Sequence, residues 1–254
     1  MLIALLSDIH ANLEALQACL GHAHDRGASH YVFLGDFVGY GADPGSVVET
    51  ISRYVADGAL AVKGNHDEAI ETIDGYFNDA AKAALEWGRA TLSAAQKQFL
   101  ASLPLILRQQ DVCYVHASAE RPERWDYIDS RSAAGRCATA AGTTHTFCGH
   151  VHDQVLFFET SRGPMREFRP SPGMPIPVHG HRRWVAIVGS VGQPRDRNPA
   201  AAYTLFDPAR QEVTFCRVVY DAAAAANKIR RCGLPASLAF RVELGIRRDR
   251  SGRR

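Results

Sequence analysis

Hydrophobic and polar positions follow two alternating patterns in the first part of the chain. Short apolar runs occupy residues 1–7, 30–36 and 60–67, and each run ends in polar or ionisable residues. The segments between them, "ANLEALQACLGHAHDRG" and "SVVETISRYVADG", carry apolar residues at helical spacing. This alternation predicts a βαβαβ unit with parallel strands, right-handed crossovers and helices on both faces of the sheet.

The rest of the chain is predicted to contain a helical insertion and further strands. Residues 79–103 have a helical pattern, with Ser93 as an N-cap and Pro104 as a stop. A hairpin is expected around Asp207-Pro208, a terminal helix near Asp221, and a surface loop in the Pro- and Gly-rich residues 169–181. Further strands are predicted within residues 106–118, 145–153, 154–160 and 182–190.

Composition favours one globular domain that spans residues 1–254. The chain has 254 residues and 46% hydrophobic content, enough for a large core. We expect a helical insertion at about 68–104 and a basic, frayed tail at about 247–254. The six cysteines are scattered and are interpreted as reduced core residues of a cytoplasmic protein.

Charge and hydropathy exclude several classes of partner. The 29 Lys and Arg residues nearly balance the 27 Asp and Glu residues, so a nucleic-acid partner is disfavoured. No apolar run approaches the roughly 20 residues that a membrane-spanning helix needs. The N-terminal run is short and has no basic segment before it, so no signal peptide is predicted.

Polar side chains gather where the predicted strands end. Each is common alone, because Asp caps helices, Gly-Asn forms turns, and a histidine is often only a hydrogen-bonding group. The carboxyl ends of parallel strands, however, open onto a common crevice where ligand sites are expected. Residues two apart in extended backbone also point to the same side. Five strand ends together therefore predict one site, with Asp8, His10, Asp36, Asn65, His66, Asp67, His116, His150 and His152.

The sequences at these strand ends resemble the motifs of a known protein family. The blocks "SDIH", "GDFVGYG", "KGNHD", "VHAS" and "GHVH", in this order, resemble the motifs of the calcineurin-like metallophosphoesterases. The later block "GSVGQPRD" is similar to one in the bacterial branch of phosphodiesterases and diadenosine tetraphosphatase-like enzymes. The resemblance implies a four-layer α-β-β-α sandwich, in which two mixed sheets pack face to face with helices outside.

The residue types predict two metal ions. Oxygen and nitrogen donors without a thiolate suit Mn²⁺, Fe, Zn²⁺, Ni²⁺ or Co²⁺ better than Ca²⁺ or Cu(I), and Mn²⁺ is the expected ion. Seven donors are too many for one such ion, and a carboxylate can bridge two ions that are about 3.5–4 Å apart. The resemblance implies one ion on Asp8, His10, Asp36 and His152, and another on Asp36, Asn65, His116 and His150.

The resemblance also implies a hydrolytic mechanism. A water between two cations loses a proton near neutral pH, and the bridging hydroxide attacks phosphorus. His66 is expected to protonate the leaving oxygen, since the pattern gives it to neither ion; the alternative is a role as a supporting hydrogen-bonding group. Asp67 either orients His66 or caps the following helix.

One departure from the family concerns the substrate. The segment "GDFVGYGADP" lacks the Asp-Arg-Gly segment of the protein phosphatases and symmetrical diadenosine tetraphosphatases, so protein phosphatase activity is disfavoured. Arg124 and Arg195 are candidate phosphate-binding residues, with a purely structural role as the alternative. Aromatic residues of the insertion are expected to pack it onto the body or, alternatively, to stack on a nucleobase: Tyr76, Phe77 and Trp87.

The predicted function is dinuclear metal-dependent hydrolysis of phosphodiester or nucleotide phosphoanhydride bonds. The substrate is expected to be small, phosphorylated and nucleotide-like, and a homo-oligomer is compatible with the sequence. Two alternatives stay open: a phosphomonoesterase, and a non-catalytic scaffold with the same fold. A scaffold should lack His66 or several ligands, and this sequence has all of them.

Overall fold

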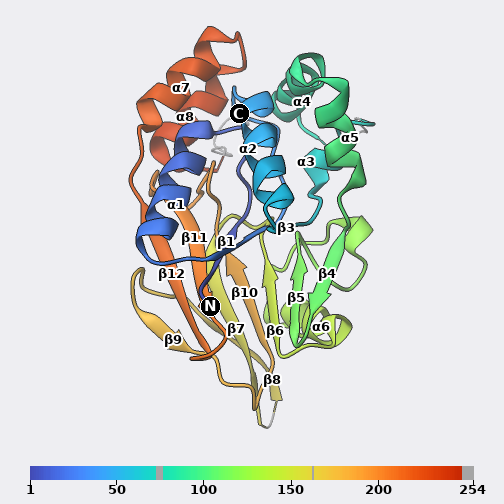
Figure 1. Cartoon of the computed structure of the whole chain (residues 1–254), viewed down its shortest axis with the longest axis vertical. Helices are drawn as coiled ribbons and strands as arrows, with labels where there is room; N and C mark the ends of the chain where they lie inside the picture. Colours follow the sequence, from blue (N-terminus) through green and yellow to red (C-terminus); the bar gives the residue numbers. More distant parts are fainter. Residues whose placement is uncertain (73–76, 162, 248–254) are drawn as a thin grey trace, which may run out of the picture.

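Two six-stranded mixed sheets form the centre of the computed structural model, which describes residues 1–72, 77–161 and 163–247. The sheets pack face to face, and helices cover their outer faces (Figure 1). This is the predicted four-layer α-β-β-α sandwich. No helix among the described residues is both long and apolar enough to cross a membrane.

The first sheet has the strand order β3-β2-β1-β11-β12-β9. Its first three strands are parallel, as predicted, and β11 and β12 form the predicted hairpin. The short strand β9 lies in the Pro- and Gly-rich stretch that was expected to be only a loop; its prolines are tolerated because β9 is an edge strand. The strands are β1 Ile3–Leu6, β2 His30–Phe33, β3 Leu60–Ala61, β9 Pro175–Pro177, β11 Ala201–Asp207 and β12 Glu212–Val218.

The second sheet has the order β4-β5-β6-β10-β7-β8. Strands β5, β6 and β10 are parallel neighbours, while β4, β7 and β8 pair antiparallel with theirs. The edge strand β8 was not predicted, since its residues are mostly exposed and show no apolar run. The strands are β4 Ile106–Gln109, β5 Val112–Val115, β6 His145–Cys148, β7 Gln154–Thr160, β8 Gly163–Phe168 and β10 Trp184–Val188.

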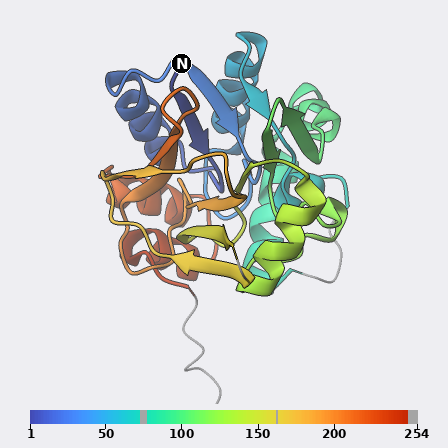
Figure 2. The ribbon, with the colours of Figure 1, turned by 90° about the horizontal axis from the view of Figure 1, so that it is seen from below.

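Helices α1 (Leu13–Asp25) and α2 (Pro44–Ala56) both pack on the outer face of the first sheet. The prediction that helices cover both faces of this sheet is wrong, because the alternate residues of its strands form a second apolar face. Ala4 and Leu6 contact the helices, whereas Ile3 and Leu5 join the core between the sheets. Figure 2 shows α1 and α2 and the yellow-green helix α6 on opposite sides of the strands.

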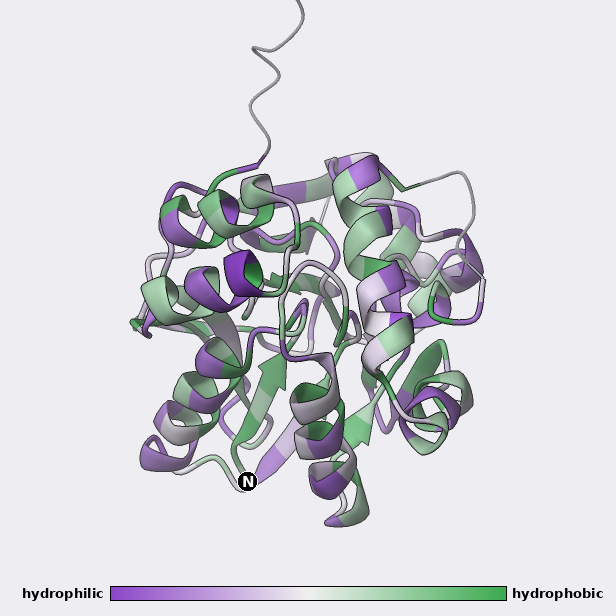
Figure 3. Ribbon diagram, turned by 90° about the horizontal axis from the view of Figure 1, so that it is seen from above, coloured by the Kyte–Doolittle hydropathy of each residue, from purple (hydrophilic) through white to green (hydrophobic). Residues whose placement is uncertain are grey.

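The remaining helices cover the second sheet and the end of the sandwich where the parallel strands stop. Ser93 forms a capping box with Gln96 at the start of α5, as its N-cap position predicted. Figure 3 shows apolar strands in the centre and polar positions on the surrounding helices. The elements are α3 Asn65–Glu68, α4 Asp79–Thr91, α5 Ala94–Ser102, the 3₁₀ helix Pro122–Arg124, α6 Arg131–Ala141, α7 Ala222–Arg231 and α8 Ala236–Leu244.

Candidate metal centre

Five loops at one end of the sandwich bring the predicted ligands together. Asp8 and His10 follow β1, Asp36 follows β2, and Asn65 begins α3. The other three follow strands of the second sheet, so both sheets contribute to the site. All seven predicted ligands are buried, with at most 6% of each residue exposed. They are Asp8, His10, Asp36, Asn65, His116, His150 and His152. Burying so many polar groups costs free energy unless hydrogen bonds, opposite charges or metal ions compensate for the lost water.

Backbone conformation at these strand ends turns the side chains toward the common site. Five of the predicted ligands have a left-handed backbone, with φ between 49° and 71°. This region is uncommon for residues other than glycine, although Asp and His enter it several-fold more often than most residue types. Such conformations cluster at functional sites, where the surrounding structure fixes them. The five residues are Asp8, His10, Asp36, His150 and His152.

The first donor group consists of Asp8, His10 and His152. Nε2 of His152 lies 3.2 Å from Oδ1 of Asp8 and 3.2 Å from Nε2 of His10. The Nδ1–H groups of His10 and His152 donate to the backbone carbonyls of Val38, at 3.1 Å, and Gln193, at 2.6 Å. These bonds fix the tautomer, so the Nε2 lone pairs of both rings face each other and are available to a cation.

The second donor group consists of Asp36, His116 and His150. Nε2 of His116 lies 3.3 Å from Oδ2 of Asp36 and 3.2 Å from Nδ1 of His150. Oδ2 of Asp36 also lies 3.7 Å from Nε2 of His10, which belongs to the first group. One carboxylate oxygen therefore stands between the two groups, as a bridging ligand would.

Three buried atoms of the predicted metal ligands have no hydrogen-bond partner among the described residues. These atoms are Oδ1 of Asp8, Oδ1 of Asn65 and Nε2 of His150. Leaving a buried acceptor unpaired costs about 1–3 kcal/mol. Metal ligation would satisfy the two oxygen atoms, which lie on residues predicted to bind different ions. The residues therefore fit a pair of metal ions.

Burial and neighbouring charges shift the pKa values of the site residues. Burial raises the pKa of Asp8 to about 6 and lowers the pKa values of His10 and His152 well below the ordinary histidine range. Burial also opposes ionisation of Asp36, but the charge of His116 outweighs it and holds the pKa of Asp36 well below its usual value. Burial would lower the pKa of His116, yet the Asp36 carboxylate raises it to about 9. Positive charge is thus stabilised next to Asp36, where a cation would replace the His116 proton.

His66 lies beside both groups and is surrounded by rings. Its imidazole contacts the rings of Tyr40, at 4.6 Å, His10, at 4.8 Å, and Phe77, at 5.0 Å between centroids. Its Nδ1 is buried without a hydrogen-bond partner among the described residues and faces Gly39, where a Cβ would overlap the ring. Burial lowers the pKa of His66 to about 4. Ring packing, rather than a carboxylate, therefore holds this histidine.

Asp67 binds backbone amides. Its carboxylate accepts from the N–H groups of Asp36 at 2.8 Å, Phe37 at 2.8 Å and Gly64 at 2.9 Å. Of the two predicted roles, this geometry corresponds to the helix cap; no hydrogen bond joins Asp67 to His66 among the described residues. Asp67 thereby ties the loop that carries Asp36 to the start of α3. Burial raises the pKa of Asp67 to about 7.

The two candidate phosphate-binding arginines lie in different places. A cavity of about 260 Å³ opens over the donor groups, and Arg195 and Arg247 are in its wall. Arg195 is half-buried and forms no hydrogen bond or ion pair within the described part of the chain, so its charge is free to face an anion. Arg124 lines a neighbouring cavity.

Two predictions, on Tyr76 and on tail residues 248–254, concern positions outside the described residues.

Three aromatic residues of the site were missed by sequence reasoning. Tyr40 packs on His10 with 4.6 Å between ring centroids, and Tyr127 stacks on His150 at 4.0 Å. Trp125 meets the ring of His116 edge-on at 5.9 Å. Tyr40 could have been suspected, because it lies inside the "GDFVGYG" block, but Trp125 and Tyr127 have no local signal.

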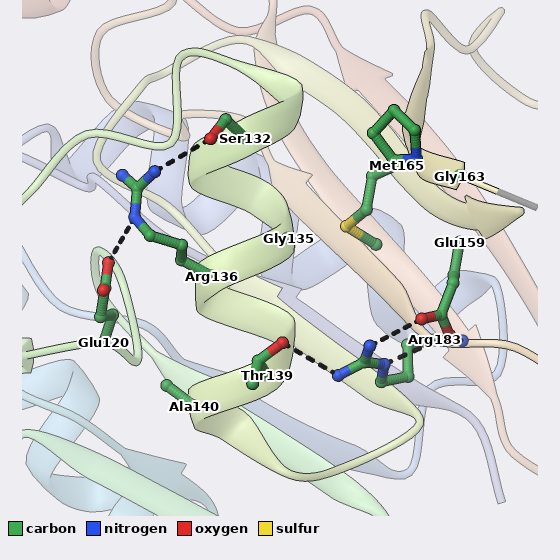
Figure 4. Close-up of a pocket in the computed structure, with 11 residues that line it drawn as sticks. Glu120, Ser132, Gly135, Arg136, Thr139, Ala140, Glu159, Gly163, Met165 and Arg183 are labelled. Atoms are coloured by element: carbon green, nitrogen blue, oxygen red, sulfur yellow. Dashed lines mark hydrogen bonds and ion pairs between the residues drawn. The ribbon is translucent and has the colours of Figure 1, made fainter.

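A larger cavity, of about 510 Å³, lies between α6 and the β7–β8 hairpin (Figure 4). It contains none of the predicted site residues. Its cations are already paired: Arg136 binds Glu120 at 2.8 Å, and Arg183 binds Glu159 at 2.6 Å. Its size alone therefore does not indicate a functional site.

Comparisons with known proteins agree with this geometry. The family model described as the calcineurin-like phosphoesterase superfamily domain matches residues 1–210. An uncharacterized protein of Methanocaldococcus jannaschii is 35% identical over 256 residues, covering 96% of this chain and 98% of the relative. The crystal structure of a metallophosphoesterase from Sphaerobacter thermophilus is 36% identical, with a TM-score of 0.86 over 97% of this chain and 99% of that one. A hypothetical protein of Pyrococcus horikoshii, at 22% identity and a TM-score of 0.77 over 96% and 98% of the chains, shares the fold.

Proposed function

Because the chain belongs to the calcineurin-like phosphoesterase superfamily, we propose that it is a hydrolase that uses two metal ions to cleave phosphodiester or nucleotide phosphoanhydride bonds. The position of Asp36 is the observation that carries this proposal. Its Oδ2 lies 3.7 Å from Nε2 of His10 in one donor group and 3.3 Å from Nε2 of His116 in the other. A shared carboxylate oxygen is what a two-ion site requires.

The proposed ligand sets are those that the family resemblance implies, and the two donor groups contain six of the seven residues. When bound, the ions would supply Lewis-acid chemistry, which activates water and neutralises charge on the phosphoryl oxygens. The nitrogen and oxygen donors suit Mn²⁺, Fe, Zn²⁺, Ni²⁺ or Co²⁺, and Mn²⁺ is the ion we propose. Asp8, His10, Asp36 and His152 hold one ion, and Asp36, Asn65, His116 and His150 hold the other.

His66 protonates the oxygen of the leaving group. Its ring lies in the wall of the site cavity, beside both donor groups. Burial keeps the pKa of this ring at about 4, which leaves it neutral at pH 7 before substrate binds. An anionic substrate next to the ring favours the protonated form. The packing of Tyr40 and Phe77 against the ring fixes the direction in which the proton is delivered.

Arg195 binds the phosphate. It lines the cavity and forms no ion pair with any carboxylate in the described ranges. A guanidinium in this position matches two phosphoryl oxygens at once and opposes their negative charge. An unpaired arginine over a cluster of metal donors supports a phosphorylated substrate.

The proposal is tested by hydrolysis of bis-p-nitrophenyl phosphate by the purified protein reconstituted with Mn²⁺. Release of p-nitrophenol in proportion to bound metal is the expected result. Faster hydrolysis of p-nitrophenyl phosphate would instead assign a phosphomonoesterase. No hydrolysis of either compound with any of the five metals would refute catalysis and favour the scaffold. A screen of cyclic nucleotides and dinucleoside polyphosphates then ranks natural substrate classes.

A further inference from the structure

A second cavity adjoins the cavity over the metal donors. It has a volume of about 230 Å³, and Asn65 and Phe77 line both cavities, so the two lie side by side. Small-molecule sites usually measure about 300–1,000 Å³, which is more than either cavity offers alone. A substrate that reaches the metal donors can therefore extend from one cavity into the other.

Trp125 forms one wall of this second cavity and is held there firmly. Its indole Nε1–H donates to Oε2 of Glu68 at 2.9 Å, and its ring meets the metal-site residue His116 edge-on. Its φ of 56° is left-handed. For a bulky side chain this conformation is a true outlier that persists only when neighbouring contacts fix it, and such outliers cluster at ligand sites.

Phe77 forms another part of the wall, on the side of the proton donor. Its ring lies 5.0 Å from the ring of His66. The leaving oxygen must come close to His66 to receive a proton. The organic part of the leaving group attached to that oxygen therefore points past Phe77 toward Trp125.

Charge in the second cavity disfavours a second phosphate. Glu68 and Glu123 line it together with one cation, Arg124. The excess of carboxylates repels anions, whereas two aromatic walls suit an uncharged flat ring. The excess of negative charge and the two aromatic walls of this cavity thus indicate that it binds an uncharged aromatic group.

We propose that this second cavity binds a flat ring carried by the leaving group, and that the substrate is accordingly a nucleotide or aryl phosphate compound. The inference rests on the proposed hydrolase function, because it takes the metal donors as the place of the phosphorus atom. Nucleobases and simple aryl groups share the required chemistry, and a comparison of two ligands distinguishes them.

Binding is measured by isothermal titration calorimetry on the Mn²⁺-loaded protein, so that the readout does not depend on turnover. The probes are adenosine 5′-monophosphate, phenyl phosphate, ribose 5-phosphate and inorganic phosphate. Adenosine 5′-monophosphate is expected to bind about 5- to 150-fold more tightly than ribose 5-phosphate, the range of one base–aromatic stack. Adenosine 5′-monophosphate binding more tightly than phenyl phosphate assigns a nucleobase; equal affinities assign an aryl group.

Four variants locate the effect. Trp125→Leu and Phe77→Leu are expected to reduce the preference for adenosine 5′-monophosphate over ribose 5-phosphate to about onefold. The affinity for inorganic phosphate should change less, although the two rings also contact His116 and His66. Trp87→Leu is the matched control, because Trp87 packs against the same apolar cluster as Phe77 but lines neither cavity. Trp125→Phe, which keeps a ring, should retain part of the preference and covers the case that the leucine variant does not fold.

Two outcomes would overturn the inference. One is equal affinity of the wild-type protein for adenosine 5′-monophosphate, phenyl phosphate and ribose 5-phosphate. The other is a preference that survives both leucine variants or falls equally in Trp87→Leu. A protein that binds these ligands as expected but hydrolyses neither p-nitrophenyl ester would refute the hydrolase proposal and leave the ring-binding cavity supported.

Discussion

The metal-site cavity and the outer cavity between α6 and the β7–β8 hairpin differ in how their polar groups are satisfied. The outer cavity is about twice as large, at about 510 Å³ against 260 Å³, but its arginines already bind carboxylates. In the metal-site cavity, by contrast, Arg195 forms no hydrogen bond or ion pair with the described residues. Oδ1 of Asn65 in its wall and Oδ1 of Asp8 in the first donor group also lack a hydrogen-bond partner there. Polar groups without partners, more than volume, therefore distinguish the proposed site from the outer cavity.

The largest expected effect comes from the bridging carboxylate. Asp36→Asn keeps the shape of the side chain but removes its charge, so metal affinity should fall by more than the roughly 10- to 100-fold that is typical of supporting residues around a metal. Metal content per chain by mass spectrometry and hydrolysis of bis-p-nitrophenyl phosphate should both be lost. Glu159→Gln in the outer cavity is the matched control. Equal metal content in wild type and Asp36→Asn would contradict the two-ion assignment.

His66→Ala should reduce kcat by about 10²- to 10⁴-fold for an ester with a poor leaving group, since general acid catalysis is lost. The loss should be smaller for p-nitrophenyl esters, because p-nitrophenolate leaves without protonation. Metal content should stay at the wild-type level. A loss of the same size for both kinds of ester would show that His66 does not protonate the leaving oxygen.

Arg195→Ala should weaken kcat/KM by roughly 10- to 150-fold, the range for a lost hydrogen bond to a charged group. The corresponding change in the outer cavity, Arg136→Ala, should alter kcat/KM by no more than about twofold, since this arginine already binds Glu120. Steady-state kinetics on bis-p-nitrophenyl phosphate measures both. Similar losses in the two variants would remove the distinction between the cavities.

The smallest effect is expected for Arg183→Ala. Its side chain is 38% exposed, and its ion pair with Glu159 is screened by solvent. The free energy of unfolding should therefore fall by less than about 1 kcal/mol. Urea denaturation measures it, with the wild-type protein in parallel. A clearly larger loss would mean that the outer cavity is a structural centre of the second sheet.

Local patterns predicted much of the fold. The βαβαβ start, the N-cap at Ser93 and the hairpin around Asp207 all depend on neighbouring residues, so the sequence alone reveals them. Helix α6 was overlooked although Ser130 caps its start and the left-handed Gly142 ends it. The second apolar face of β1 could not be assigned from residues alone, because the partner sheet consists of segments more than 100 residues later.

The candidate site likewise contains residues that the sequence predicted and residues that it did not. Every predicted ligand lies at a strand end, where the parallel sheet indicated it. Trp125 and Tyr127 reach the site from a loop with no motif, and their contacts with His116 and His150 exist only in the folded chain. Which of the two roles Asp67 has was also beyond the sequence, because two of the amides it binds, those of Asp36 and Phe37, belong to a loop about 30 residues away.

The left-handed backbone at Tyr40 and Trp125 has a practical consequence for engineering. Glycine would relieve backbone strain of about 1–2 kcal/mol, but Tyr40→Gly also removes a buried ring that packs on His10 and His66, a loss of about 3–5 kcal/mol. Both Tyr40→Gly and Trp125→Gly would strip away the aromatic surroundings of the proton donor and the leaving group. Stability and turnover should therefore fall together at these positions, so a selection for heat resistance should keep both rings.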